Sequence, residues 1–249
     1  MNLPGFDIAD SGVSTVAARE RLIVALDVPN GIEALALVER LGNLVQWFKV
    51  GLELYLAEGN GIVEQIRARG YSVFLDLKLH DIPNTVAGAV RSVAASGAGM
   101  LTVHAAGGPA MLAAAREAAA AVASAPKLLA VTVLTSMDAG QLEATGVCSS
   151  PGDQVLRLAG VAYEAGIRGF VASSQEVARL RSSFGDATLV IPGIRPAGVK
   201  AGDQKRVATP GLAIADGADY LVVGRPITQA PDPAAAAQAI LDEMETAKK

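Results

Sequence analysis

Cysteine, histidine and aromatic residues are scarce in this 249-residue sequence. The single cysteine, Cys148, excludes a disulfide within the chain and leaves no cysteine cluster that could hold zinc. Two histidines, His80 and His104, are too few for a convincing transition-metal site. We therefore expect no metal centre, and the lone thiol favours a reducing compartment, the cytoplasm.

Long apolar runs and clusters of positive charge are also missing. Each apolar stretch meets Gly, Lys or Asp well before the roughly 18 residues that a membrane-spanning helix needs. The N-terminus lacks the basic stretch followed by an apolar run that is typical of a secretory signal. The net charge is -4, without a run of Lys or Arg. We therefore expect neither a membrane nor a nucleic acid as a partner.

The sequence does contain short aliphatic runs that alternate with longer helical patterns. The predicted strands are Leu22–Asp27, Trp47–Val50, Val73–Leu77, Met100–His104, Leu128–Leu134, Gly169–Ala172, Leu189–Ile191 and Tyr220–Val223. The predicted helices are Ile32–Leu41, Gly61–Arg69, Thr85–Ser96, Ala110–Ala123, Gln154–Glu164, Ser174–Arg181, Leu212–Asp216 and Pro233–Lys248. Nearly continuous apolar strands indicate a parallel sheet that is covered on both faces. Eight such units predict an α/β fold, a single-domain (β/α)8 TIM barrel over residues 21–249 that follows an N-terminal extension, residues 1–20.

Charged residues recur where the predicted strands end. Asp27 ends the first strand, Lys49 lies in the second, and Asp76 and Lys78 lie at the end of the third, with Asp81 in the turn that follows. In an extended strand residues i and i+2 point to the same side, so Asp76 and Lys78 should face the same way. In a barrel this pattern predicts a confined network of alternating charges at the active-site end. The alternative interpretation is a set of salt bridges that only stabilises the barrel.

A phosphate-binding turn is predicted near the C-terminus. The last strand ends in Gly224 and Arg225, which offer backbone N–H groups and a guanidinium to a phosphate dianion. Barrels commonly bind phosphate after strands seven and eight. Arg195 and Gln204, in the glycine-containing loop Gly193–Lys205, could complete the site, and this loop is a candidate lid. A simple turn with a surface arginine is the alternative.

Both histidines lie near predicted strand ends. Either could serve as a general base, but neither is paired with an obvious nucleophile, so hydrogen-bonded structural histidines are the favoured interpretation. Gly107 and Gly108 are too short a motif for dinucleotide binding, and no strand is followed by G-x-G-x-x-G.

Eight segments of the chain together resemble the orotidine 5'-monophosphate decarboxylase family. The segments are LIVALDVPN, FKVGLELYLAEG, VFLDLKLHDIPNT, LTVHAAGG, VTVLTSMD, LVIPGIRP, DQKRVATP and DYLVVGRPI. They cover the chain from about Leu22 to Ile227 in the family's order. The D-x-K-x-x-D core is shared by a wider suprafamily of phosphate-binding barrels, and a lysine at position 49 narrows the resemblance to the decarboxylase.

The resemblance implies the activity and the role of each site residue. The reaction is decarboxylation of orotidine 5'-monophosphate to UMP in pyrimidine biosynthesis, without a cofactor, in a homodimer with shared active sites. Lys78 would protonate C6, Asp76 would face the substrate carboxylate, and Lys49 and Asp81 would hold the network, with Asp81 reaching into the partner's site. The implied substrate-binding residues are Asp27, Thr135, Ser136, Pro192, Arg195, Gln204, Gly224 and Arg225.

Two other functions are compatible with parts of this pattern. A 3-keto-gulonate-phosphate decarboxylase or hexulose-phosphate synthase resembles the same core but needs Mg²⁺ and carries an acidic residue where Lys49 stands. A non-catalytic nucleotide-binding barrel would use the Arg225 site and leave the lysine–aspartate network idle. Lys49 is the residue that discriminates the first of these from the decarboxylase.

Overall fold

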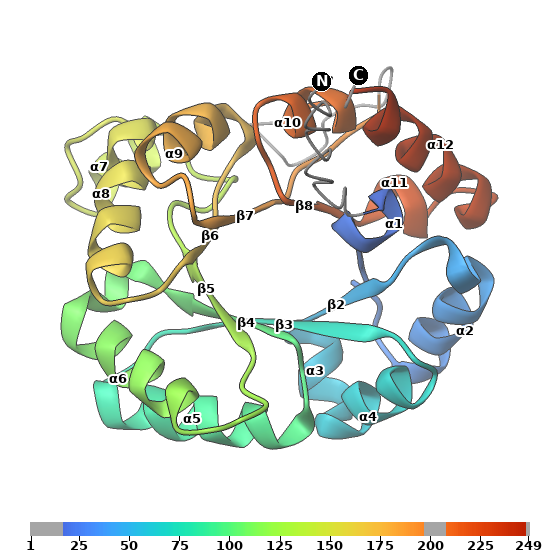
Figure 1. Ribbon diagram of the computed structural model, residues 1–249, viewed down its shortest axis with the longest axis horizontal. Coiled ribbons are helices and arrows are strands. Elements are labelled where there is room, and N and C mark those ends of the chain that lie inside the picture. Colours follow the sequence, from blue (N-terminus) through green and yellow to red (C-terminus); the bar gives the residue numbers. More distant parts are fainter. Residues whose placement is uncertain (1–16, 197–207, 248–249) are drawn as a thin grey trace, which may run out of the picture.

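A closed barrel of parallel strands forms the centre of the molecule (Figure 1). The computed structural model describes residues 17–196 and 208–247. Within these residues eight strands pair in chain order, each with the next, and β8 pairs with β1 to close the barrel. The predicted single-domain (β/α)8 TIM barrel is confirmed.

The strands follow the aliphatic runs of the sequence closely. They are β1 (Leu22–Ala25), β2 (Trp47–Gly51), β3 (Ser72–Leu79), β4 (Met100–His104), β5 (Lys127–Val131), β6 (Gly169–Val171), β7 (Thr188–Ile191) and β8 (Tyr220–Val223). The main difference is at β5, which ends at Val131 and not at Leu134. Residues 132–134 instead lead into the loop that enters the cavity described below.

Helices surround the barrel and cover its outer face (Figure 1). The longer ones are α2 (Gly31–Leu41), α4 (Asn60–Ala68), α5 (Pro83–Ser96), α6 (Gly108–Ala120), α8 (Pro151–Glu164) and α12 (Pro233–Thr246). The shorter ones are α1 (Ala18–Arg21), α3 (Leu52–Glu58), α7 (Ala139–Ala144), α9 (Val177–Ser183), α10 (Pro210–Ala215) and α11 (Arg225–Thr228). Single 3-10 turns are η1 (Gly42–Leu44), η2 (Ala105–Gly107) and η3 (Ser174–Glu176). Four of the short helices, α1, α3, α7 and α11, were not predicted, whereas α9 and α10, which are also short, were. Short helices carry little periodic signal, so their prediction from sequence is uneven.

Two apolar layers explain why the strands are apolar throughout. Ile23, Phe74 and Leu129 belong to a cluster inside the barrel. Their neighbours, such as Val24 and Leu75, pack outward against the helices. Because successive side chains of a strand point to opposite faces, a strand covered on both faces must be apolar at every position. Ala18, in the predicted N-terminal extension, is buried in the outer layer.

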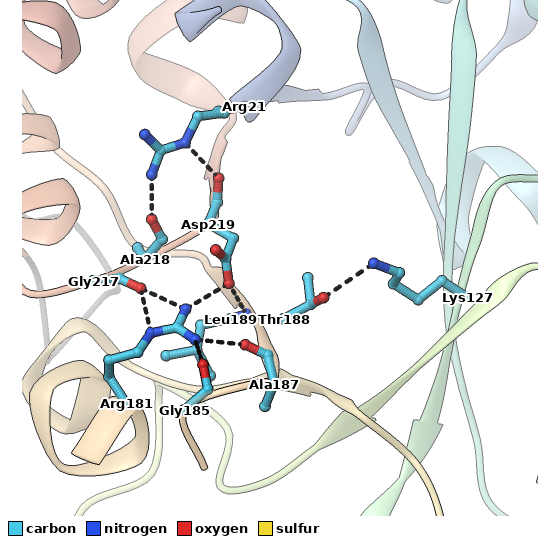
Figure 2. A network of polar contacts seen from close by, with 10 residues as sticks. All are labelled: Arg21, Lys127, Arg181, Gly185, Ala187, Thr188, Leu189, Gly217, Ala218 and Asp219. Atoms are coloured by element: carbon cyan, nitrogen blue, oxygen red, sulfur yellow. Dashed lines mark hydrogen bonds and ion pairs between the residues drawn. The ribbon is translucent and has the colours of Figure 1, made fainter. Parts of the chain in front are cut away.

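An arginine–aspartate network ties β7 to β8 at the N-terminal ends of the strands (Figure 2). The Arg181 guanidinium donates to the carbonyl oxygens of Gly217, Gly185 and Ala187 and pairs with Asp219 Oδ2 at 2.6 Å. Asp219 Oδ2 also accepts from Leu189 N at 2.7 Å. At this end of a barrel such contacts stabilise the fold and leave the opposite end for chemistry.

Among the helices in the described part of the chain, none combines the length and the apolar character that a membrane span requires.

Candidate active site

A cavity of about 360 Å³ opens at the C-terminal ends of the strands. Asp27 follows β1, Lys49 lies near the end of β2, and Asp76 and Lys78 lie in the last part of β3, and all four line this cavity. The three strands are neighbours in the barrel, so their ends converge. The charges that the sequence placed at successive strand ends therefore lie together around one space.

The four side chains form a continuous chain of alternating charge. Lys49 Nζ lies 3.0 Å from Asp27 Oδ1 and 3.6 Å from Asp76 Oδ2. Lys78 Nζ lies 2.8 Å from Asp76 Oδ1. The side chains of Lys49 and Asp76 are 11% and 14% exposed, whereas Asp27 is 58% exposed at the mouth. Each buried charge thus has a partner of opposite sign, which a buried ion needs in order to stay ionised.

Asp76 is the electrostatic centre of this chain. Burial by itself raises the pKa of its carboxyl group. The charges of Lys49 and Lys78, together with hydrogen bonds from Lys78 and Thr102, outweigh burial, so the pKa of Asp76 is lowered below its usual value of 3.8. Asp76 is therefore a carboxylate at neutral pH, held between two ammonium groups.

Gly51 leaves space for the end of the Lys49 side chain. A Cβ at Gly51, two residues further along β2, would lie 3.0 Å from Lys49 Nζ and 3.4 Å from Asp27 Oδ1. Any other residue at position 51 would press on the ion pair between Lys49 and Asp27. The glycine that ends β2 is thus part of the way the sequence builds the site.

The backbone around Lys78 is not the regular strand that the i, i+2 argument assumed. Lys78 has φ +48, the only non-glycine residue with positive φ in the described chain, and the pairing of β3 with β4 shifts register between Leu75 and Leu79. This left-handed conformation costs on the order of 1–3 kcal/mol and is typical of functional sites. Lys78 does contact Asp76 as expected, but it does so from an irregular part of β3 and not from a regular strand.

A second group of predicted residues forms the other side of the cavity. Pro192, Gly193 and Arg195 follow β7, Gly224 and Arg225 follow β8, and all five line the cavity. Arg195 is 9% exposed, and its backbone N–H donates to Ala208 O at 3.0 Å. Burial and then the charge of Arg225 lower the pKa of Arg195. Two guanidinium groups thus approach one another, an arrangement that an anion would stabilise.

The other predicted site residues are placed differently. Thr135 lines the cavity, whereas Ser136 and Asp81 are exposed and are absent from its described lining. Asp81 Oδ1 accepts a hydrogen bond from Ile82 N at 2.6 Å. Gln204 and most of the predicted lid Gly193–Lys205 lie outside the described residues.

Two polar residues at the site were not predicted. Gln229, just after α11, lines the cavity. Thr102, in β4, donates to Asp76 Oδ1 at 3.1 Å and is fully buried. A polar residue at the centre of the apolar run MLTVH was the signal for Thr102, because a buried hydroxyl needs a partner.

The two histidines have structural contacts. Their rings stack with centroids 5.2 Å apart and planes inclined by 17°. His104 Nδ1 accepts from Ala106 N at 3.3 Å, which caps η2. Burial, followed by the charges of His80 and Lys78, lowers the pKa of His104, so its ring is neutral at pH 7. His104 is thus hydrogen-bonded, as the favoured interpretation expected.

Enzymes with a TIM barrel have their active sites at the C-terminal ends of the strands. The closed barrel and the charged cavity at this end define the protein as a (β/α)8-barrel enzyme. The family model "Orotidine 5'-phosphate decarboxylase / HUMPS family" matches residues 20–240. The chain belongs to this family.

Individual relatives agree with the family match. Orotidine 5'-phosphate decarboxylase of Halorhodospira halophila is 52% identical over 234 residues, which cover 94% of this chain and 99% of the relative. That of Anaeromyxobacter dehalogenans is 54% identical over 222 residues, 89% of this chain and 96% of the relative. The crystal structure of the Lactobacillus acidophilus enzyme of that name superimposes with a TM-score of 0.79 at 39% identity, covering 90% of this chain and 99% of that one. The predictions of the family and of a decarboxylase of pyrimidine biosynthesis are confirmed.

Proposed function

We propose that this enzyme converts orotidine 5'-monophosphate to UMP and CO2 without a cofactor, in the cytoplasm. The observation that carries the proposal is the row of ion pairs from Asp27 through Lys49 and Asp76 to Lys78. It lies on the wall of a cavity that two arginines also line. The substrate has a carboxylate at its reacting carbon and a phosphate at its other end. A lysine network and an arginine pair within one cavity suit these two anionic groups.

Lys78 is the proposed proton donor. In the reaction the bond between C6 of the pyrimidine and the carboxylate carbon breaks, CO2 leaves, and the electron pair stays on C6. A carbanion on this sp2 carbon has no adjacent carbonyl to delocalise it, so a fixed ammonium must stabilise it. Lys78 Nζ, held 2.8 Å from Asp76, then gives a proton to C6 and regains one from water.

Lys49 takes the place that a divalent cation would have between two carboxylates. Its ammonium group lies 3.0 Å from Asp27 Oδ1 and 3.6 Å from Asp76 Oδ2, and Lys78 supplies the second positive charge beside Asp76. Mg²⁺ sites in proteins instead use one or two carboxylates whose charge the metal neutralises. This arrangement supports a metal-independent reaction over the Mg²⁺-dependent chemistry of the 3-keto-gulonate-phosphate decarboxylase and hexulose-phosphate synthase alternatives.

The remaining residues are assigned to substrate binding. Asp27, exposed at the mouth of the cavity, binds the ribose, and Thr135 or its neighbour Ser136 reads the pyrimidine edge. The proposed phosphate-binding residues are Arg195, Gln204, Gly224 and Arg225, and Pro192 is a further proposed substrate-binding residue. Binding of the phosphate, remote from C6, supplies energy that holds the reacting group in place.

The activity is tested by following the ultraviolet absorbance of orotidine 5'-monophosphate in EDTA. Loss of substrate absorbance with formation of UMP is the expected result. Folded protein that leaves the substrate unchanged in EDTA, but turns over 3-keto-gulonate phosphate once Mg²⁺ is added, would refute the proposal. UMP binding without turnover of either substrate would instead identify a non-catalytic nucleotide-binding barrel.

Replacement of Arg225 by alanine should discriminate between substrates with and without phosphate. A charge-assisted bond of about 1.5–3 kcal/mol corresponds to a loss of roughly 10- to 100-fold. We expect this loss in kcat/KM for orotidine 5'-monophosphate and little change for the phosphate-free nucleoside, both measured at one salt concentration. Arg179→Ala is the matched control, since Arg179 pairs with Asp153 outside the cavity. Equal losses on both substrates would remove Arg225 from the phosphate site.

Asp81 is proposed to complete the active site of a partner subunit in a homodimer. In this chain its side chain is exposed and does not contact the network of Lys49, Asp76 and Lys78, and its neighbour Ile82 is 67% exposed. A solvent-facing aspartate next to a large exposed apolar residue suits a contact with a second copy.

Subunit mixing tests this arrangement. A heterodimer of Asp81→Ala and Lys78→Ala chains should recover roughly half of the parental activity, because one of its two sites is then intact. A heterodimer of a parental chain and a chain with both substitutions should be inactive, because each site lacks one residue. If the second heterodimer is active and the first is not, Asp81 serves its own subunit and the sites are not shared.

A further inference from the structure

The end of β3 that carries Asp76 and Lys78 is not held to β4 by a regular ladder. The pairing register passes from Leu75–Leu101 to Leu79–Val103, so β3 takes four residue steps where β4 takes two. The segment in between contains Lys78 in its left-handed conformation. Something other than ladder pairing must therefore hold this segment in its shape.

Thr102 of β4 supplies that contact with a single hydroxyl group. Its Oγ1 accepts a hydrogen bond from Lys78 N at 2.8 Å and donates one to Asp76 Oδ1 at 3.1 Å. The residue is fully buried, so water does not compete for either bond. One oxygen thus touches the backbone of the lysine and the carboxylate that pairs with that lysine's ammonium group.

A second contact holds the far end of the same segment. His80, two residues after Lys78, stacks on His104, two residues after Thr102. The His104 ring is itself fixed by the hydrogen bond from Ala106 N. The segment from Lys78 to His80 thus contacts β4 at each end, and of these two contacts only the one through Thr102 also reaches Asp76.

We propose that Thr102 is a positioning residue for the proton donor. Its hydroxyl holds the Lys78 backbone at positive φ and orients Asp76, and together these set where the Lys78 ammonium group stands against the reacting carbon. The inference rests on the proposed function, because the role of Lys78 as proton donor does. Displacement of a reacting group by about 1 Å can cost roughly 100-fold in rate, so the effect of losing the hydroxyl should be large.

The test compares Thr102→Val, which keeps the shape and removes the hydroxyl, with Thr102→Ser, which keeps the hydroxyl. We expect Thr102→Val to lower kcat by about 100-fold, with the affinity for UMP changed less than about threefold, and Thr102→Ser to stay near the parent. Active sites are counted by UMP binding, so kcat refers to folded protein. If Thr102→Val does not fold, Thr102→Ala is measured in the same way.

Thr132→Val is the matched control. Thr132 is equally buried, follows the neighbouring strand β5, and donates its hydroxyl to Val171 O at 2.9 Å without contacting the network. Equal kcat losses in the Thr102 and Thr132 variants, or a Thr102→Val enzyme that only melts at a lower temperature, would overturn the proposal.

Crystal structures of the parent and of Thr102→Val separate this inference from the proposed function. We expect Lys78 to leave positive φ, or its 2.8 Å contact with Asp76 to break, in the variant. An unchanged segment would refute the role of Thr102 whatever the turnover. A parent that does not decarboxylate orotidine 5'-monophosphate would refute the proposed function, and the geometric result would still decide the role of Thr102.

Discussion

Replacement of Lys78 by alanine should reduce decarboxylation by about 10⁴-fold, the upper end of what a general acid contributes. The magnitude is large because the Lys78 ammonium group serves twice in the proposed mechanism, first by stabilising charge at C6 and then by donating the proton. The substitution also removes the cation 2.8 Å from Asp76 Oδ1, and this oxygen keeps the hydrogen bond from Thr102. Asp76 keeps Lys49 as a partner, so the fold and the binding of UMP should be retained.

Single-turnover measurement of UMP formation, with UMP binding as the measure of intact sites, checks this expectation. Lys127→Ala is the matched control, because Lys127 is exposed at the opposite end of the barrel, where it donates to Thr188 Oγ1 at 3.0 Å (Figure 2). It should retain parental turnover. A Lys78→Ala enzyme within tenfold of the parent would show that another group protonates C6.

Lys49→Met should damage both stability and activity. Lys49 is 8% exposed and is the cation between Asp27 and Asp76, so methionine leaves two carboxylates without the charge that separates them. Breaking a buried ion pair by removing one partner destabilises a protein by about 3–5 kcal/mol. We expect a loss of this order in the free energy of unfolding at pH 7, measured by urea denaturation, and a kcat reduced by at least roughly 100-fold.

The pH dependence of the stability loss in Lys49→Met shows whether the loss comes from the charge of Asp76 or from packing. The pKa of Asp76 in the folded protein is lowered, so its carboxylate contributes stability that is present above the unfolded value of 3.8 and is lost as the pH falls further. Lys49→Met weakens this lowering. The stability difference between parent and variant should therefore be full at neutral pH and shrink as the pH falls below 3.8.

Asp219→Asn supplies the comparison for Lys49→Met. It breaks the pair with Arg181 at the N-terminal end of the barrel, so it should lower stability and leave kcat unchanged. A difference between parent and Lys49→Met that stays constant through the acid range would trace the loss to packing and not to the charge of Asp76.

Much of the architecture could be predicted because it depends on local patterns. Strands covered on both faces must be apolar at every position, and the runs at Ile23 and Leu101 are examples. The order of the strands followed from the alternation of runs and helices, since parallel neighbours require a crossover between them. The short helix α3 was missed because it begins directly after β2 and has too few residues to show a period.

The active site, like the fold, could be predicted from the sequence in part. The charged residues at the ends of the first three strands, and the arginines after the last two, could be recognised from the sequence because polar groups at the ends of apolar strands are conspicuous. The contact between Asp76 and Lys78 was expected from strand periodicity, but β3 is irregular at this point, with Lys78 at φ +48. Periodicity describes a regular strand and contains no information about where the ladder is interrupted.

By itself, the sequence determined the fold class, the position of each strand and the types of charge that gather at one end of the barrel. These properties follow from the apolar character of buried strands and from the repeated alternation of strands and helices, and both can be read from residues that are close in the sequence. Only the tertiary structure decided that Lys49 stands between Asp27 and Asp76, that Gly51 leaves room for it, and that Thr102 joins Lys78 to Asp76. These contacts join residues up to 27 positions apart in the chain, and their distances are set by the register at which the barrel closes.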